Sequence, residues 1–167
     1  DGSYIEKTDA FCANTSVSYN GEQIAIWKVD GEIKTTVLAS KIVHEMFHGY
    51  QTVQGWNCSA NEMEALCRYE YSAENLTLKL RENDLLLSLL DGSDEAALRE
   101  LMAHRKLRSE IYPYEYSYES KVEEIEGTAT YVEWMVLKQL DEREAKVLTN
   151  RMRTVMTKPE YLLPIRI

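Results

Sequence analysis

Two histidines in the chain have the spacing of a metal-binding pair. His44 and His48 are four residues apart, and Glu45 follows the first of them. Side chains four residues apart on a helix project from one face, about one turn from each other, so both imidazoles can reach one metal ion. Imidazole nitrogen suits zinc, and a glutamate beside the first histidine can act as general base toward a water activated by the metal. The segment therefore predicts a zinc site on a helix.

A catalytic zinc site needs a third protein ligand, and two glutamates further along the chain are candidates. No third histidine follows soon after His48, whereas Glu123 and Glu126 fall on a helix expected downstream. Glu126 is followed by Gly127 and Ala129, small residues that allow this helix to approach the HExxH helix closely. We therefore favour Glu126 as the third ligand, with Glu123 as the alternative.

Together the two motifs resemble a known enzyme family. HExxH at 44–48, followed by EGxAxY at 126–131, is similar to the gluzincin branch of the zincin metallopeptidases. The resemblance implies zinc-dependent hydrolysis of peptide bonds, with a peptide or protein as substrate. It implies Zn²⁺ ligands at His44, His48 and Glu126, with Glu45 as the general base. Thermolysin-like members have an aspartate four residues after the ligand glutamate to orient a zinc histidine, and Thr130 stands there instead.

A hydrolase of this kind also needs a donor that stabilises the oxyanion. Tyr131 is the predicted catalytic phenol, although it lies about 140° around the helix from Glu126. The alternating tyrosines of 112–118 have the period of an extended segment, which could line the cleft or pack as an aromatic loop over the core. His104 lies in a basic stretch and is expected to be solvated.

Two polar side chains are candidates for supporting the zinc histidines. Gln51 lies three residues beyond His48 and therefore shares the zinc-facing side of its helix. It is either a hydrogen-bond partner of a histidine or a polar surface residue. Glu64 could hold a histidine through the free ring nitrogen, or be an exposed carboxylate.

The segments around the motifs predict one mostly helical α+β domain over 1–167, zincin-like in its order of elements. Residues 23–29 alternate as a strand does, and the turn at Asp30-Gly31 predicts a return strand at 32–34. This gives a small N-terminal β-element within 1–34. About five helices are expected, at 35–54, 60–90, 93–111, from between 113 and 121 to 140, and at 141–157. Gly55 should end the first helix and Ser93 should cap the third, and 60–111 forms a helical insertion between the two zinc motifs.

Composition narrows the choice of partners and compartment. The 167 residues carry 28 acidic and 19 basic side chains, a formal net charge of −9, which argues against nucleic acid and anionic membranes as partners. The most apolar stretch, 85–90, is too short to span a bilayer. Three cysteines do not make a disulfide framework, so cytoplasm is the default expectation, although a leader or upstream domain could precede Asp1. Cys67 is expected to be buried on the apolar side of its helix, with no disulfide to Cys58.

Two other functions fit the same sequence. One is a zincin-like domain that binds zinc for assembly or recognition without turnover. The other is a helical interaction protein in which HExxH occurs by chance. Replacing the two histidines distinguishes the chance occurrence from a true metal site, because only a true site should lose zinc binding.

Overall fold

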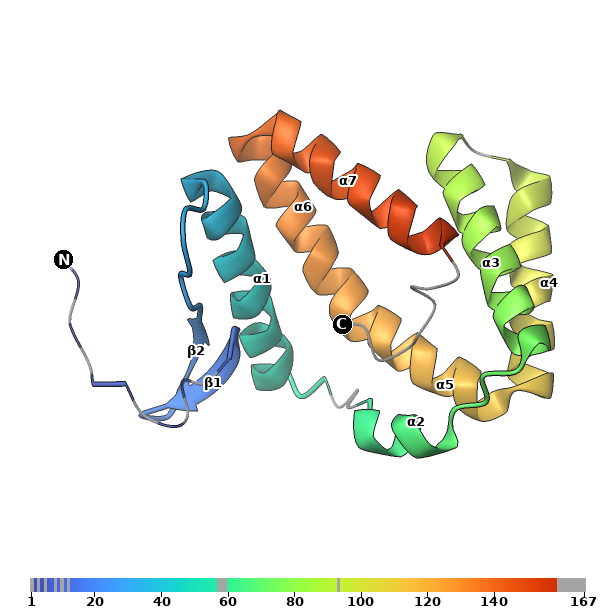
Figure 1. The fold of residues 1–167 in the computed structure, drawn as a ribbon, viewed down its shortest axis with the longest axis horizontal. Helices are drawn as coiled ribbons and strands as arrows, with labels where there is room; N and C mark the ends of the chain where they lie inside the picture. The colour runs from blue at the N-terminus through green and yellow to red at the C-terminus, as the bar shows by residue number, and fades with distance from the viewer. Residues whose placement is uncertain are drawn as a thin grey trace. The chain divides into compact units, whose positions relative to one another are not determined.

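The computed structural model describes residues 2, 4, 6, 7, 9, 11, 13–56, 60–92 and 94–158. Its elements are β1 (Thr15–Tyr19), β2 (Glu22–Ile26), α1 (Thr35–Val53), α2 (Glu62–Arg68), α3 (Ala73–Asp91), α4 (Glu95–Ile111), α5 (Pro113–Val122), the π-helical turn η1 (Glu123–Gly127), α6 (Thr128–Leu140) and α7 (Glu142–Thr157) (Figure 1). This confirms a mostly helical chain with a small antiparallel sheet near its N-terminus. The predicted cap at Ser93 is wrong, because Asp94 is the N-cap of α4 and its side chain accepts from the backbone amides of Ala96 and Ala97. The predicted pairing state of Cys58 lies outside the described residues.

The chain divides into two compact units. The first, termed the α1–α6 unit, comprises 1–57 and 125–146, and the second, termed the α2–α5 unit, comprises 58–124 and 147–167. The whole of the predicted insertion, 60–111, therefore falls in the α2–α5 unit. The prediction of a single domain stays a prediction.

The β-element is a hairpin formed by β1 and β2, paired from Thr15 opposite Ile26 to Tyr19 opposite Glu22. Its turn is Asn20-Gly21, and both residues have positive φ, as a two-residue type I′ turn requires. The strand predicted at 23–29 is confirmed over its first part, but the return strand predicted at 32–34 is wrong. The Asn-Gly turn pairs β2 with the segment before it, and 32–34 leads directly into α1.

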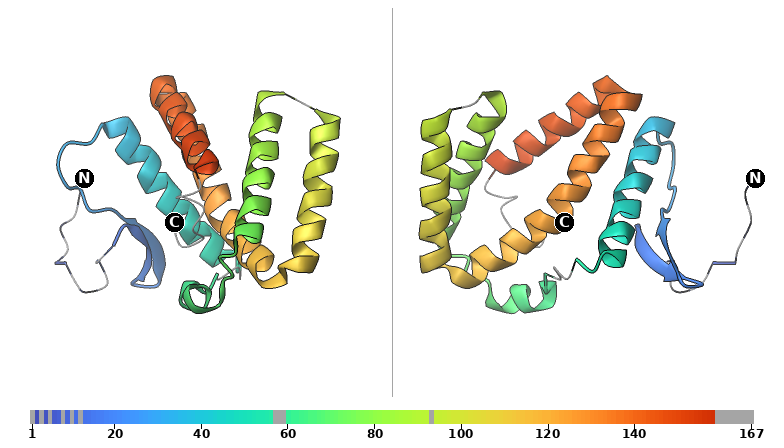
Figure 2. Two further views of the ribbon diagram at one scale, coloured as in Figure 1. Left: turned by 45° about the vertical axis from the view of Figure 1, so that its right-hand side comes forward. Right: turned by 180° about the vertical axis from the view of Figure 1, so that it is seen from behind.

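Helix α1 carries the HExxH motif and packs against both the hairpin and α6, as the views of Figures 1 and 2 agree. It ends before Gly55, which has a φ of 69° and so reverses the chain as predicted. At Gly49 the hairpin comes so close that an added Cβ would lie 2.9 Å from Oγ of Ser16. On the other side, Ala129 of α6 is completely buried, which fits the close approach expected of its small side chain.

The segment before α6 is helical where an extended run was expected. The tyrosines of 112–118 lie at the start of α5, so the prediction of an extended aromatic segment is wrong. Pro113 occupies the first turn, where its fixed φ favours a helix, and the buried residues Glu115, Tyr118 and Glu119 recur at helical spacing. The tyrosines alternate with other residues along the sequence, but this alternation does not match the pattern of buried residues in α5.

The α2–α5 unit combines two long helices, α3 and α4, with the shorter α2 and α5. The single helix predicted at 60–90 is wrong, because the chain leaves the helix at Tyr69, whose ψ is 129°. Ser72 then caps α3 by accepting a hydrogen bond from the Asn75 amide. The exposed Cys67 on α2 corrects the expectation that it is buried.

A buried charged network holds α3, α4 and α5 of this unit together. The guanidinium of Arg108 is completely buried and donates to Glu82 at 2.8 Å and to Glu119 at 2.8 and 2.9 Å. Glu119 also accepts from the Tyr69 hydroxyl and pairs with Lys79 at 3.0 Å. Each buried charge therefore has an opposite partner, as burial demands.

No helix within the described residues is both long and apolar enough to cross a membrane.

Candidate metal centre

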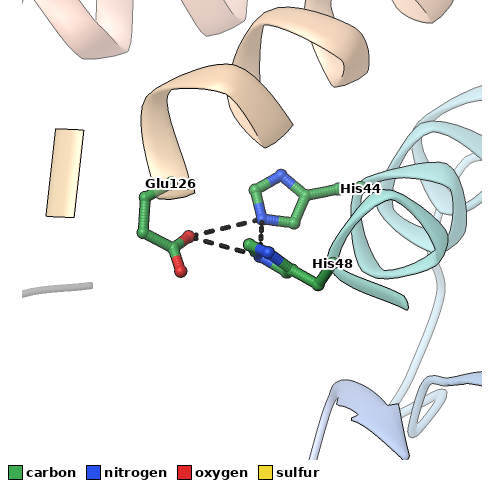
Figure 3. A group of neighbouring side chains, drawn as sticks. All are labelled: His44, His48 and Glu126. Atoms are coloured by element: carbon green, nitrogen blue, oxygen red, sulfur yellow. Dashed lines mark hydrogen bonds and ion pairs between the residues drawn. The ribbon is translucent and has the colours of Figure 1, made fainter. Parts of the chain in front are cut away.

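Three side chains of the α1–α6 unit meet at one point (Figure 3). Oε2 of Glu126 lies 3.5 Å from Nε2 of His44 and 3.5 Å from Nε2 of His48. The two Nε2 atoms are 3.1 Å apart. The histidines point from adjacent turns of α1 toward the glutamate of η1, and all three residues are partly buried. The three residues predicted as ligands therefore lie in one cluster, and their role as ligands stays a prediction.

The separations of these atoms fit a tetrahedral zinc ion. Ligand atoms that lie 2.0–2.1 Å from a tetrahedral zinc are about 3.3 Å from one another. The three observed separations, 3.1, 3.5 and 3.5 Å, scatter around that value. Two imidazoles and one carboxylate are also a donor set of catalytic zinc sites, in which a fourth position stays open.

The ring nitrogen of His44 that faces away from Glu126 contacts a buried carboxylate that was not predicted from the sequence. Oε2 of Glu133 lies 3.1 Å from Nδ1 of His44, and its Oε1 lies 2.7 Å from Nζ of Lys41. Glu133 is only 2% exposed. Glu133 is therefore placed to orient the ring of His44. In thermolysin-like members an aspartate at the position of Thr130 orients a zinc histidine. The position of Glu133 seven residues after Glu126, two helical turns on and on the same face, was the available signal.

His48 is held by Gln51, which resolves the choice left open for that residue. Oε1 of Gln51 lies 2.8 Å from Nδ1 of His48, and the side chain is 4% exposed. Gln51 is therefore a buried partner of the histidine and not a surface residue. With both Nδ1 atoms engaged, both Nε2 atoms face Glu126, as metal-binding histidines with orienting partners do.

The electrostatics of the cluster show strong coupling between the three groups. Burial lowers the pKa of His44, but its contacts with Glu126 and Glu133 outweigh this and raise the pKa to about 9. The contact with Glu126 likewise raises the pKa of His48. For Glu126, burial favours the neutral acid, but the two histidines overcome it and lower the pKa to about 2. The contacts between the three groups therefore favour charged imidazoles beside an ionised carboxylate when no metal is bound.

Glu45 lies beside the cluster but is not one of its three members. Its side chain is buried, and burial raises the pKa of its carboxyl above the ordinary value, opposed by the charges of His44 and His48. No hydrogen bond or ion pair involving Glu45 is found among the described residues. A carboxylate with a raised pKa next to a metal site has the properties of a general base.

The alternatives for the third ligand separate clearly. Glu123 pairs with Lys79 at 3.2 Å and with Arg105 at 2.9 Å, both in the α2–α5 unit. Glu126, on the other side of the division between the units, is the carboxylate that contacts the histidines. The structure therefore brings Glu126 into the cluster and Glu123 into an ion-pair network.

The remaining candidates do not join the cluster. Tyr131 is 60% exposed on α6, and its ring stacks on Trp134. Its predicted catalytic role stays a prediction. His104 is partly buried, with Nε2 3.0 Å from the carbonyl of Leu78, so it is less solvated than expected. Glu64 forms an exposed ion pair with Arg68 within α2.

Comparison of the chain with protein-family models, with curated proteins and with solved structures gave no match. The functional assignment therefore depends on the motifs and on the geometry of the cluster.

Proposed function

We propose that the α1–α6 unit binds one zinc ion through His44, His48 and Glu126, and that the protein is a gluzincin-type zinc peptidase. The observation that carries the proposal is the convergence of three ligand atoms at zinc-like separations. The buried partners of both Nδ1 atoms add to it, because a chance HExxH has no need of them.

The order of elements is consistent with a zincin-like fold. A small sheet precedes and packs on the HExxH helix, and a downstream helical segment lies against the other side of that helix with the third ligand at its start. The resemblance of the two motifs to gluzincins supports a peptide bond as the bond that is cleaved.

Each residue of the cluster has a separate role in the proposed reaction. A bound zinc ion supplies a water of lowered pKa and polarises the substrate carbonyl. Glu45 takes the proton from the attacking water on its carboxylate and delivers it to the leaving amine. The raised pKa of Glu45 favours this exchange, because the group must both accept and release a proton. Glu133 and Gln51 keep both histidines turned toward the ligand site.

The test is cleavage of a mixed peptide library by zinc-loaded protein, compared with the Glu45→Gln variant. We expect the wild type to cleave peptides and the variant to retain zinc while losing cleavage. Removal of a general base costs about 10²–10⁴-fold in rate. A wild type that binds zinc but cleaves nothing would favour the alternative, a zincin-like domain that binds without turnover. The exposed position of Tyr131, the predicted oxyanion donor, is the observation that favours this alternative.

A further inference from the structure

Gln51 makes contacts at both ends of its side-chain amide. Its Nε2 donates to the carbonyl of Ile125 at 3.0 Å and to Oγ1 of Thr128 at 2.9 Å, while Oε1 faces Nδ1 of His48 at 2.8 Å. His48 lies on α1 with Gln51, whereas Ile125 and Thr128 lie in η1 and α6, which pack against α1 within the first unit. The side chain is 4% exposed, so water does not replace these contacts.

The chemistry of these partners fixes the orientation of the amide. A backbone carbonyl can only accept a hydrogen bond, so the atom of Gln51 that faces Ile125 must be the NH₂ group. Oε1 must then face His48 and accept, which makes Nδ1 of His48 the donor. In the neutral ring, the form that binds a metal ion, the lone pair is then on Nε2, the atom that lies beside Glu126.

The same amide also holds the turn that carries the third ligand. Ile125 and Glu126 are neighbours in η1, and the carbonyl of Ile125 accepts a second hydrogen bond, from Thr128 Oγ1 at 3.2 Å. A π-helical turn is uncommon and is found often at functional sites. Gln51 and Thr128 both bind the carbonyl next to Glu126, and so restrain the backbone from which that ligand projects.

We propose that Gln51 is a positioning residue that joins His48 to the turn bearing Glu126, so that one side chain sets both the histidine tautomer and the place of the third ligand. The inference rests on the proposed zinc site. It does not depend on whether that site cleaves peptides.

The test compares Gln51→Leu with a matched control, Gln54→Leu. Leucine removes both hydrogen-bonding ends of the amide while keeping a side chain of similar size and good helix propensity. Gln54 follows α1 directly as its C-cap residue and is exposed. We expect Gln51→Leu to lower zinc affinity about 10- to 100-fold, as loss of a partner to a ligand does. The control should bind zinc as the wild type does, in competition titrations with a chromogenic chelator.

Cobalt(II) in place of zinc supplies a readout that a purely structural role would not change. Its visible absorption depends on the geometry of the ligands, so at saturating cobalt we expect an altered spectrum for Gln51→Leu and an unaltered one for Gln54→Leu. Thr128→Val provides a milder variant that keeps the contact with His48. It loses two hydrogen bonds of Oγ1, with Gln51 and with Ile125, and we expect it to lower zinc affinity roughly 2- to 10-fold.

The outcomes separate this role from the proposed function. A Gln51→Leu protein that is less stable to heat but keeps the wild-type zinc affinity and cobalt spectrum would overturn the positioning role and leave the zinc site intact. A wild type that binds neither metal would overturn the proposed function and this role with it. If Gln51→Leu alters zinc affinity and the cobalt spectrum but the wild type cleaves no peptide, the result would support the positioning role and count against the peptidase.

Discussion

Replacing Glu133 by glutamine tests how far the buried carboxylate behind His44 supports the metal centre. The wild-type carboxylate bridges Nδ1 of His44 at 3.1 Å and Nζ of Lys41 at 2.7 Å, and is almost completely buried. The amide has nearly the same shape but no charge. Its single oxygen can serve one of the two donors, and its NH₂ group must face the other or turn away.

The magnitude follows from the kind of contact that is lost. The contact between Nδ1 of His44 and Glu133 is a buried ion pair at 3.1 Å, and a polar contact to a charged group contributes about 1.5–3 kcal/mol. Since about 1.4 kcal/mol corresponds to a tenfold change in an equilibrium constant, zinc affinity should fall about 10- to 100-fold. Lys41 retains some access to water, with its side chain 28% exposed. The cost to the metal-free protein should therefore be smaller, about 1–2 kcal/mol, or roughly 2–8 °C in melting temperature.

The assay is competitive zinc titration together with thermal unfolding of the metal-free protein. Glu142→Gln is the matched control, because Glu142 pairs with Lys146 on the surface with both side chains about 70% exposed. An exposed pair of this kind should change stability by less than about 0.5 kcal/mol and leave zinc affinity unchanged. A Glu133→Gln protein with wild-type zinc affinity would refute the reasoning, since the carboxylate would then have no influence on the ligand.

Four further predictions concern the third ligand, the pH dependence of zinc binding and of stability, and the charged network of the α2–α5 unit. Glu126→Ala should abolish tight zinc binding while Glu123→Ala keeps it, and equal losses in chelator competition would contradict the ligand assignment. Zinc affinity should rise with pH up to about 9, because the pKa of His44 is raised to about 9 and zinc must displace the proton from this imidazole. A zinc affinity that does not change with pH would argue against zinc binding at His44. The same shift stabilises the metal-free fold below pH 6.5, and this contribution should be lost as the pH rises through about 9, as urea unfolding at several pH values would show. Arg108→Met should cost about 3–5 kcal/mol in urea unfolding, because it leaves Glu119 buried without its main partner, and a cost below about 1 kcal/mol would show that the network is not needed.

The parts of the site that depend on local spacing could be predicted from the sequence. The four-residue separation of the histidines places them on one side of any helix, and the fully buried Ala129 marked the place of close approach that favoured Glu126 over Glu123. The close approach expected at Gly127 is wrong, because a Cβ added there would meet nothing within 4 Å. Gly55 ends α1 because a left-handed residue is needed there.

The parts that depend on contacts between distant segments could not be predicted in this way. Glu133 contacts a histidine on another helix, and its spacing from Glu126 does not show which side chain it meets until α6 is placed against α1. The partner of β2 was predicted after it in the chain, at 32–34, whereas the structure pairs β2 with β1 before it. The polar sequence of β1 hid this strand, although the Asn20-Gly21 turn was the stronger hairpin signal. The break at Tyr69 interrupts an apolar pattern that continues across it, so only the Ser72 cap could have indicated it.

The most direct test of the central claim is the metal content of protein purified without a metal-affinity step, measured by elemental mass spectrometry. The account predicts close to one zinc per chain after zinc is supplied and the excess removed by dialysis. A chain that retains no zinc under these conditions would contradict it, and would leave His44, His48 and Glu126 as a hydrogen-bonded cluster without a metal.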